Sequence, residues 1–205
     1  MSVMTTTLRR HGATMIERDG RLVVKHFGSP ASEAAVCRSS VGLAERSDRA
    51  TLELSGAPQA VDEALAEIGR FADAAWWVRR TPHRAIVRCE GAAADACTAL
   101  MVRAEDVTVT DISADCAALD LVGPHAADVL RAHLEQEGRP VVLVVRRDAA
   151  CVELLVARAH GPALWNGLLE LGDPYGIACV GIEALEHLDV SERLTRRRAP
   201  RVPPG

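Results

Sequence analysis

The chain has 205 residues, of which 48% are hydrophobic and 3% aromatic, and its formal net charge is −4. Scarce aromatic residues and an acidic balance argue against a nucleic-acid partner, because such proteins use basic grooves and stacking side chains. No apolar stretch approaches the roughly 20 residues of a bilayer span, and neither a secretory leader nor a zinc-type cysteine spacing is visible. We therefore expect a cytoplasmic protein with an aliphatic core, core thiols and no bound metal.

The first 29 residues are expected to form an arm with one strand, 21–26, which follows a turn at Arg18-Asp19-Gly20. A helix is predicted from Pro30, because Ser29 can cap it and Glu33 falls in its first turn. Downstream, apolar patterns predict an ordered series of strands and helices. Strands are expected at 42–45, 50–54, 75–79, 84–89, 107–112, 117–121, 141–145 and 152–157, and helices from Ala57, near 92–102, from Pro124, and at 160–171 and 182–188.

A repeat at a spacing of about 66 residues organises this series. Ser47 recurs as Ser113 after 66 positions, and Gly56 recurs as Gly123 after 67. Each unit reads strand, strand, helix, strand, strand, helix, which belongs to the α+β class with mostly antiparallel pairing. Two such units can share one core, so a single duplicated domain is expected. The repeat units span about residues 41–104 and 107–172.

No standard catalytic constellation is visible, so no catalytic residue is assigned. The sequence has no P-loop, no GxGxxG after a strand, no GxSxG elbow and no HExxH helix. Arg79-Arg80 and Arg146-Arg147 end equivalent strands of the two units, where clustered guanidinium groups could bind a carboxylate or phosphate. Salt bridging or protection of a strand edge is the alternative. The carboxylate of Glu153, between apolar neighbours, faces either a groove or solvent.

A further set of motifs extends over residues 30–194. They are 33–36, 41–43, Ser47, 52–56, 141–147, 152–154, 163–165, 168–169, Gly172, 175–176 and 181–185. In order and spacing these motifs resemble the folate-binding domain of the glycine-cleavage aminomethyltransferase (T-protein) superfamily, whose fold is itself an internal duplication. The resemblance implies one α+β folate-binding domain over residues 30–194, with Glu153 at the folate-contacting position and Arg147 nearby.

The chain departs from the folate-dependent members in three places. Their Asn, Gly-rich turn and paired Asp motif has no counterpart between Phe71 and Val87, where Trp76-Trp77 instead resembles a strand of the sarcosine oxidase gamma subunit. The Gly-rich loop before Glu153 is cut short, since five residues separate it from Arg147. No C-terminal barrel domain is expected, as in the gamma subunit.

The resemblance therefore implies a sarcosine oxidase gamma-like subunit, a non-catalytic assembly component that binds larger flavoprotein subunits and holds no flavin itself. The alternative is a stand-alone tetrahydrofolate-dependent aminomethyl or one-carbon transferase, with Glu153, Arg147, Arg79 and Arg80 as candidate cofactor-binding residues. The same fold could also be repurposed to bind another small molecule in a biosynthetic pathway. Residues 195–205 are expected to form a disordered tail rich in arginine and proline.

Overall fold

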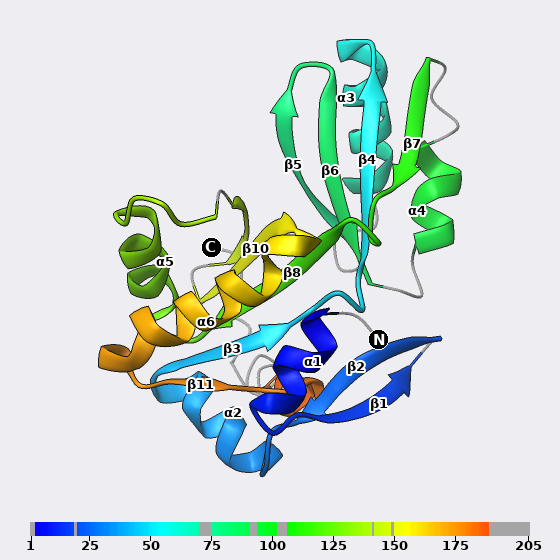
Figure 1. The fold of residues 1–205 in the computed structure, drawn as a ribbon. Helices are drawn as coiled ribbons and strands as arrows, with labels where there is room; N and C mark the ends of the chain where they lie inside the picture. Colours follow the sequence, from blue (N-terminus) through cyan, green and yellow to red (C-terminus); the bar gives the residue numbers. More distant parts are fainter. Residues whose placement is uncertain are drawn as a thin grey trace, which may run out of the picture.

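The computed structural model describes residues 3–18, 20–69, 75–90, 94–101, 106–140, 142–148 and 150–188, and Figure 1 shows their fold. The strands are β1 (Thr14–Arg18), β2 (Arg21–His26), β3 (Val41–Glu45), β4 (Ala50–Gly56), β5 (Ala75–Thr81), β6 (Arg84–Cys89), β7 (Val107–Asp111), β8 (Cys116–Val122), β9 (Leu143–Asp148), β10 (Cys151–Ala157) and β11 (Ile177–Cys179). The helices are α1 (Val3–Arg10), α2 (Pro30–Ser39), α3 (Pro58–Ile68), α4 (Ala94–Met101), α5 (Ala126–Leu134), α6 (Gly161–Gly172), the 3-10 turns η3 (Arg158–His160) and η4 (Asp173–Tyr175), and a helix at 182–188. The mixed α+β class is confirmed.

Two sheets form the centre of the molecule. One has the strand order β11-β3-β8-β10-β9 and the other the order β5-β6-β4-β7. Pairing within both is antiparallel except between β11 and β3. Strand by strand, β5, β6, β4 and β7 of the smaller sheet correspond to β9, β10, β8 and β3 of the larger sheet. Each sheet therefore contains one strand from the other half of the chain: β3 in the larger sheet and β7 in the smaller one.

Strand pairing also follows the spacing of the sequence repeat. In the smaller sheet Leu52 pairs with Val87, and in the larger sheet Leu119 pairs with Leu154. Both partners in the second pair lie 67 positions after their counterparts in the first. The crossed pairs, β3 with β8 and β7 with β4, are antiparallel in both sheets. Equivalent segments of the two halves therefore occupy equivalent places in the two sheets.

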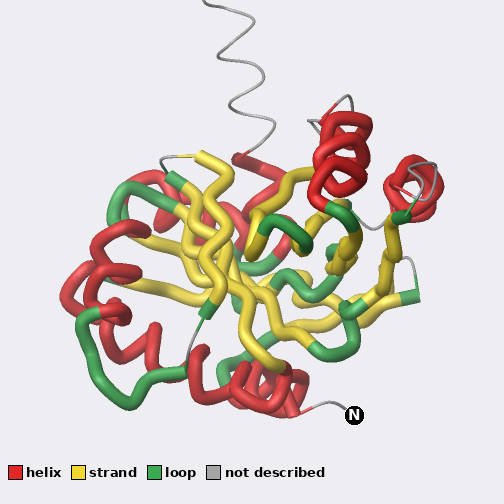
Figure 2. Tube along the Cα trace, turned by 90° about the horizontal axis from the view of Figure 1, so that it is seen from above, coloured by secondary structure: helices red, strands yellow, loops and turns green. Residues whose placement is uncertain are grey.

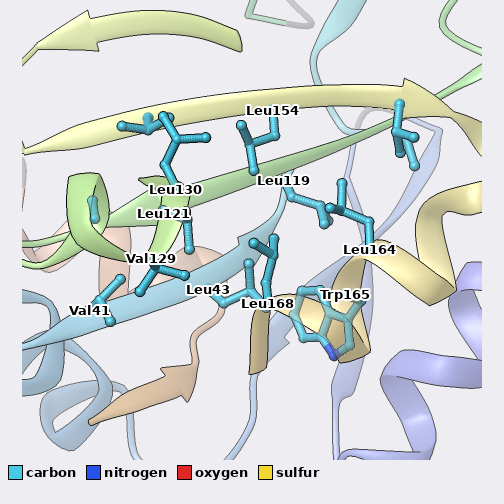
Figure 3. Close-up of a cluster of buried hydrophobic side chains, with 14 of the residues drawn as sticks. Val41, Leu43, Leu119, Leu121, Val129, Leu130, Leu154, Leu164, Trp165 and Leu168 are labelled. Atoms are coloured by element: carbon cyan, nitrogen blue, oxygen red, sulfur yellow. The ribbon is translucent and has the colours of Figure 1, made fainter. Parts of the chain in front are cut away.

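Each sheet is covered by helices that bury an aliphatic core. In Figure 3 Trp165 and Leu168 of α6 lie with Leu119 of β8, and these side chains are fully buried. Burying one large apolar side chain contributes about 1.5–3 kcal/mol. The smaller sheet has its own core, to which α3 contributes Val61 and Ile68. Figure 2 shows the helices on the outer sides of the strands.

The N-terminal arm contains more structure than the predicted single strand. The strand β2 forms at the predicted residues, but it pairs with the unpredicted β1, and α1 precedes both. The helix α1 contains three threonines, which have low helix propensity. It is held by packing, because Met4 and Leu8 are buried in the core beneath α6. The domain boundaries stay a prediction, and residues 195–205 lie outside the described residues.

The helix α2 ties the N-terminal hairpin to the C-terminal segment. Ser29 caps it as predicted, accepting a hydrogen bond from the Ser32 N–H. Glu33 in the first turn is buried, and its two carboxylate oxygens accept the N–H groups of Phe27 and Gly181, each at 2.8 Å. This carboxylate therefore joins the start of α2 to the preceding residue Phe27 and to Gly181, which lies 148 positions later.

Candidate functional site

A cluster of charged side chains is buried between the two sheets. Arg46 and Arg49 come from the connection between β3 and β4, where the chain passes from one sheet to the other. Arg88 comes from β6, and Asp120 and Glu153 come from the neighbouring strands β8 and β10. All five are buried. We call these five residues the inter-sheet network.

Arg88 is the most highly hydrogen-bonded member of the inter-sheet network. It is 0% exposed, and its Nε and Nη2 donate to Glu153 Oε1 at 3.0 and 2.9 Å. Its Nη1 donates to Thr51 Oγ1, and the remaining bonds reach the main-chain carbonyls of residues 46, 49 and 50. Buried guanidinium groups are stable only when paired and hydrogen-bonded in this way.

Glu153 is bound through both carboxylate oxygens. Besides the bonds from Arg88, its Oε2 accepts the indole N–H of Trp76 at 2.7 Å, and Arg49 Nη1 lies 3.5 Å from Oε1. The side chain is 0% exposed. The sequence led us to expect this carboxylate to face a groove or solvent, and that expectation is wrong. The carboxylate instead forms a buried ion pair with Arg88. A ligand could contact Glu153 only after displacing Arg88 or Trp76.

Asp120 forms the second acidic centre of the inter-sheet network. Its Oδ2 accepts from Arg49 Nη1 at 2.9 Å and lies 3.6 Å from Arg46 Nη1. Burial, and then the neighbouring Glu153, raise the pKa of Asp120, while Arg49 and Arg46 oppose this shift. The Arg49 guanidinium also lies over the Trp76 ring, 4.9 Å from its centroid, in a cation–π contact.

The predicted arginines lie in different surroundings from Glu153. Arg79 forms an ion pair with Asp62 of α3 and donates to the main-chain oxygens of Pro58 and Pro82. Arg80 is exposed. Arg147 belongs to β9, but its side chain lies outside the described residues. Within the described part of the chain, no interaction joins Arg79 or Arg80 to Glu153.

Arg88 and Asp120, two members of the inter-sheet network, were not identified from the sequence. Arg88 stands in the apolar run of β6, and Asp120 stands in the apolar run of β8. A single charge inside an otherwise apolar strand is the signal that could have identified both, because such a charge needs a buried partner.

Apolar side chains fill the space between the sheets beside the inter-sheet network. Ile86, Ala118 and Leu155 are buried there, with Trp76 and Leu143 packed against them. A small pocket of about 250 Å³ remains at the edge of this cluster, lined by Arg80, Ile86, Ile112, Cys116, Val142, Leu143, Leu155, Val156 and Ala157. The space between the sheets is therefore largely occupied by the protein's own side chains.

The cysteines are free thiols. Cys37, Cys89 and Cys97 are buried, and the other three are half-buried. Burial raises the pKa of the Cys37 thiol to about 11 and that of Cys89 to about 12, so neither is a thiolate at neutral pH. Within the described ranges, no three His, Cys, Asp or Glu side chains are grouped as metal ligands. Every helix in those ranges is too short or too polar to cross a bilayer.

The two sheets and their covering helices define a T-protein-like fold. The chain is similar to the glycine cleavage system aminomethyltransferase T from Bartonella henselae, with a TM-score of 0.68 and 17% identity. The match covers 90% of this chain and 60% of that protein, so the chain spans about three-fifths of its length. No protein-family model and no curated protein matches the sequence.

The chain is also similar to a chain of the heterotetrameric sarcosine oxidase from Corynebacterium sp. U-96, a structure in complex with pyrrole 2-carboxylate. The TM-score is 0.51 at 20% identity, over 73% of this chain and 96% of that chain. Both likenesses concern the fold, and they confirm the T-protein-like fold expected from the sequence motifs.

Proposed function

We propose that this chain is a sarcosine oxidase gamma-like subunit, a non-catalytic assembly component of a flavin-dependent sarcosine or amine oxidase. The observation that carries the proposal is that the Glu153 carboxylate is buried and already hydrogen-bonded within the protein. At the position where the resemblance puts the folate contact, both carboxylate oxygens are bound by Arg88 and Trp76. The similar chain of heterotetrameric sarcosine oxidase, matched over 96% of its length, supports the same assignment.

The free energy of the Arg88–Glu153 ion pair disfavours opening the space around Glu153 to a ligand. Removing one partner of a buried ion pair costs about 3–5 kcal/mol, because the other charge remains uncompensated. A charged hydrogen bond from a ligand to Glu153 contributes about 1.5–3 kcal/mol in return. Tetrahydrofolate contacts to Glu153 would therefore not offset the loss of Arg88. In this proposal the inter-sheet network replaces the cofactor and stabilises the interior of a structural subunit.

Assembly is tested by coexpressing the chain with the large flavoprotein subunit of a sarcosine oxidase-like enzyme. We expect the two to copurify as one species in size-exclusion chromatography. A chain that remains monomeric in the presence of the flavoprotein subunit would contradict the proposal.

Tetrahydrofolate-dependent transfer is the second candidate, supported by the T-protein-like fold. It is tested by calorimetric titration of the isolated chain with tetrahydrofolate, with Glu153→Ala as the variant at the expected contact. We expect no saturable binding to either protein. Micromolar binding that disappears in Glu153→Ala would support the transferase instead and would make Arg79, Arg80 and Arg147 the next candidates for the anionic part of the cofactor.

We also infer that the domain arose by internal duplication. The equal spacing of the pairs Leu52–Val87 and Leu119–Leu154 supports this inference. So does the exchange of β3 and β7 between the sheets, because two copies folding together bury both apolar sheet faces.

A further inference from the structure

A second cavity lies outside the inter-sheet network. Residues of α1, of the β1–β2 hairpin and of the turn from β7 to β8 line it, and Figure 1 shows where these elements lie. Its volume is about 590 Å³, which is within the roughly 300–1,000 Å³ of small-molecule sites. Met4 and Leu8 of α1, Met15 of β1 and Ala117 of β8 line it. Leu22 also lines it and is 48% exposed. The cavity therefore offers an apolar surface that a small organic molecule could cover.

Glu45, at the end of β3, is one of two acidic residues that line this cavity, with Asp111 of β7. Neighbouring strand residues point to opposite faces, so Arg46 enters the inter-sheet network while Glu45 lines the cavity. One carboxylate oxygen, Oε1, accepts the Ser47 N–H at 3.1 Å. Burial raises the pKa of Glu45 to about 7, and nearby Asp48 raises it further, while the Ser47 bonds and Arg46 lower it.

The other charged groups around the cavity do not neutralise Glu45. Arg21 of β2 donates to the main-chain oxygens of residues 47, 48 and 49 at 3.2–3.4 Å. Arg158 of η3 donates to the Ser113 carbonyl at 3.4 Å, and Asp111 of β7 accepts the Ser113 N–H. No charged residue of α1 lines the cavity. Among the described residues, Glu45 thus has no ion-pair partner.

We propose that this cavity binds a small organic ammonium ion, with the ammonium group donating to Glu45 and the apolar body packing against Met4, Leu8 and Met15. A carboxylate in a partly apolar site without a counterion is stabilised by a bound cation. The apolar lining favours an amine with a hydrocarbon body over a metal ion, which would need several oxygen ligands. The proposal is independent of the assembly role.

Benzylamine is the probe, because it remains a cation between pH 6 and pH 8. A carboxyl with a pKa of about 7 is roughly 10% ionised at pH 6 and roughly 90% at pH 8. The affinity of the full chain for benzylamine should therefore rise about tenfold over this range. Burial raises the pKa of Cys116, the thiol in the lining, so this group stays neutral.

Calorimetry at both pH values is run on the wild type, on Glu45→Gln, and on Glu63→Gln as an exposed control in α3. Glu45→Gln should weaken binding at pH 8 about tenfold and abolish the pH dependence, while Glu63→Gln should match the wild type. Benzyl alcohol, a neutral analogue, should show no pH dependence. The proposal is overturned if benzylamine does not bind saturably at millimolar concentration, if its affinity is equal at both pH values, or if Glu45→Gln binds it unchanged.

Discussion

The inter-sheet network predicts a large loss of stability when Arg88 is replaced by Met. The substitution keeps an aliphatic side chain but removes both hydrogen bonds from Arg88 to Glu153, which is 0% exposed and keeps the bond from the Trp76 indole N–H. Breaking one side of a buried ion pair costs about 3–5 kcal/mol. Arg88 also binds main-chain carbonyls of residues 46, 49 and 50, and a buried polar group left unsatisfied costs about 1–3 kcal/mol. We therefore expect Arg88→Met to lower the free energy of unfolding by at least about 4 kcal/mol.

A double variant separates the ion pair from the remaining contacts. Arg88→Met combined with Glu153→Leu removes both charges, so the cost of an unpaired carboxylate disappears. The main-chain carbonyls and the Trp76 indole N–H still lack their partners in this variant. The double variant should be more stable than Arg88→Met alone by about 1–3 kcal/mol, and the interaction energy between the two sites should be clearly non-additive.

The assay is urea unfolding of the wild type, both single variants and the double variant at pH 7, with a linear extrapolation for each. Arg84→Met is the matched control, because Arg84 lies on the same strand and its side chain is 61% exposed. The control should remain within about 0.5 kcal/mol of the wild type. A loss below about 1 kcal/mol for Arg88→Met, or additive effects in the double variant, would refute the reasoning.

Three further substitutions have defined outcomes. Glu33→Ala leaves the buried N–H of Gly181 and the half-buried N–H of Phe27 without their acceptor. Urea unfolding should therefore show a loss of about 2–4 kcal/mol, and a loss below about 1 kcal/mol would contradict a stabilising role of these two hydrogen bonds. Trp76→Phe removes one donor to Glu153 while keeping most of the ring, and the same assay should show a loss of about 1–3 kcal/mol. Glu45 has a folded-state pKa raised from 4.5 to about 7, so wild-type stability should fall as pH rises between those values. Glu45→Gln should remove this fall and gain up to about 2 kcal/mol at pH 8, after screening by water in the cavity; parallel pH profiles of melting temperature for the two proteins would contradict this.

The order of elements was predictable because it depends on local patterns. The predicted strands and helices begin and end within three residues of the observed positions, since alternation and turn residues determine them locally. The strands β1 and β11 were not predicted. The helix α1 was not predictable in this way, because its threonines disfavour a helix and only burial of Met4 and Leu8 stabilises it.

The inter-sheet network depends on contacts that the local pattern does not contain. Arg88 and Glu153 are 65 positions apart and belong to different sheets. The repeat predicts equivalent strands, but it does not indicate that β3 and β4 diverge into separate sheets at residues 46–49. Because that divergence brings Arg46 and Arg49 between the sheets, the partners of Asp120 and Glu153 follow from topology rather than from spacing.

The end of β3 contributes one residue to the inter-sheet network and one to the cavity under α1. Glu45 and Arg46 are adjacent in sequence and point to opposite sides of β3. On one side, Arg46 meets carboxylates of Asp48 and Asp120, so charges between the sheets are matched. On the other side, Glu45 accepts a hydrogen bond from the Ser47 N–H and forms no ion pair with any residue that the structure describes. Since a half-buried carboxylate without a counterion destabilises the folded state, a ligand cation would gain more free energy beside Glu45 than between the sheets. A small-molecule ligand of this chain is therefore expected in the cavity under α1 rather than at Glu153.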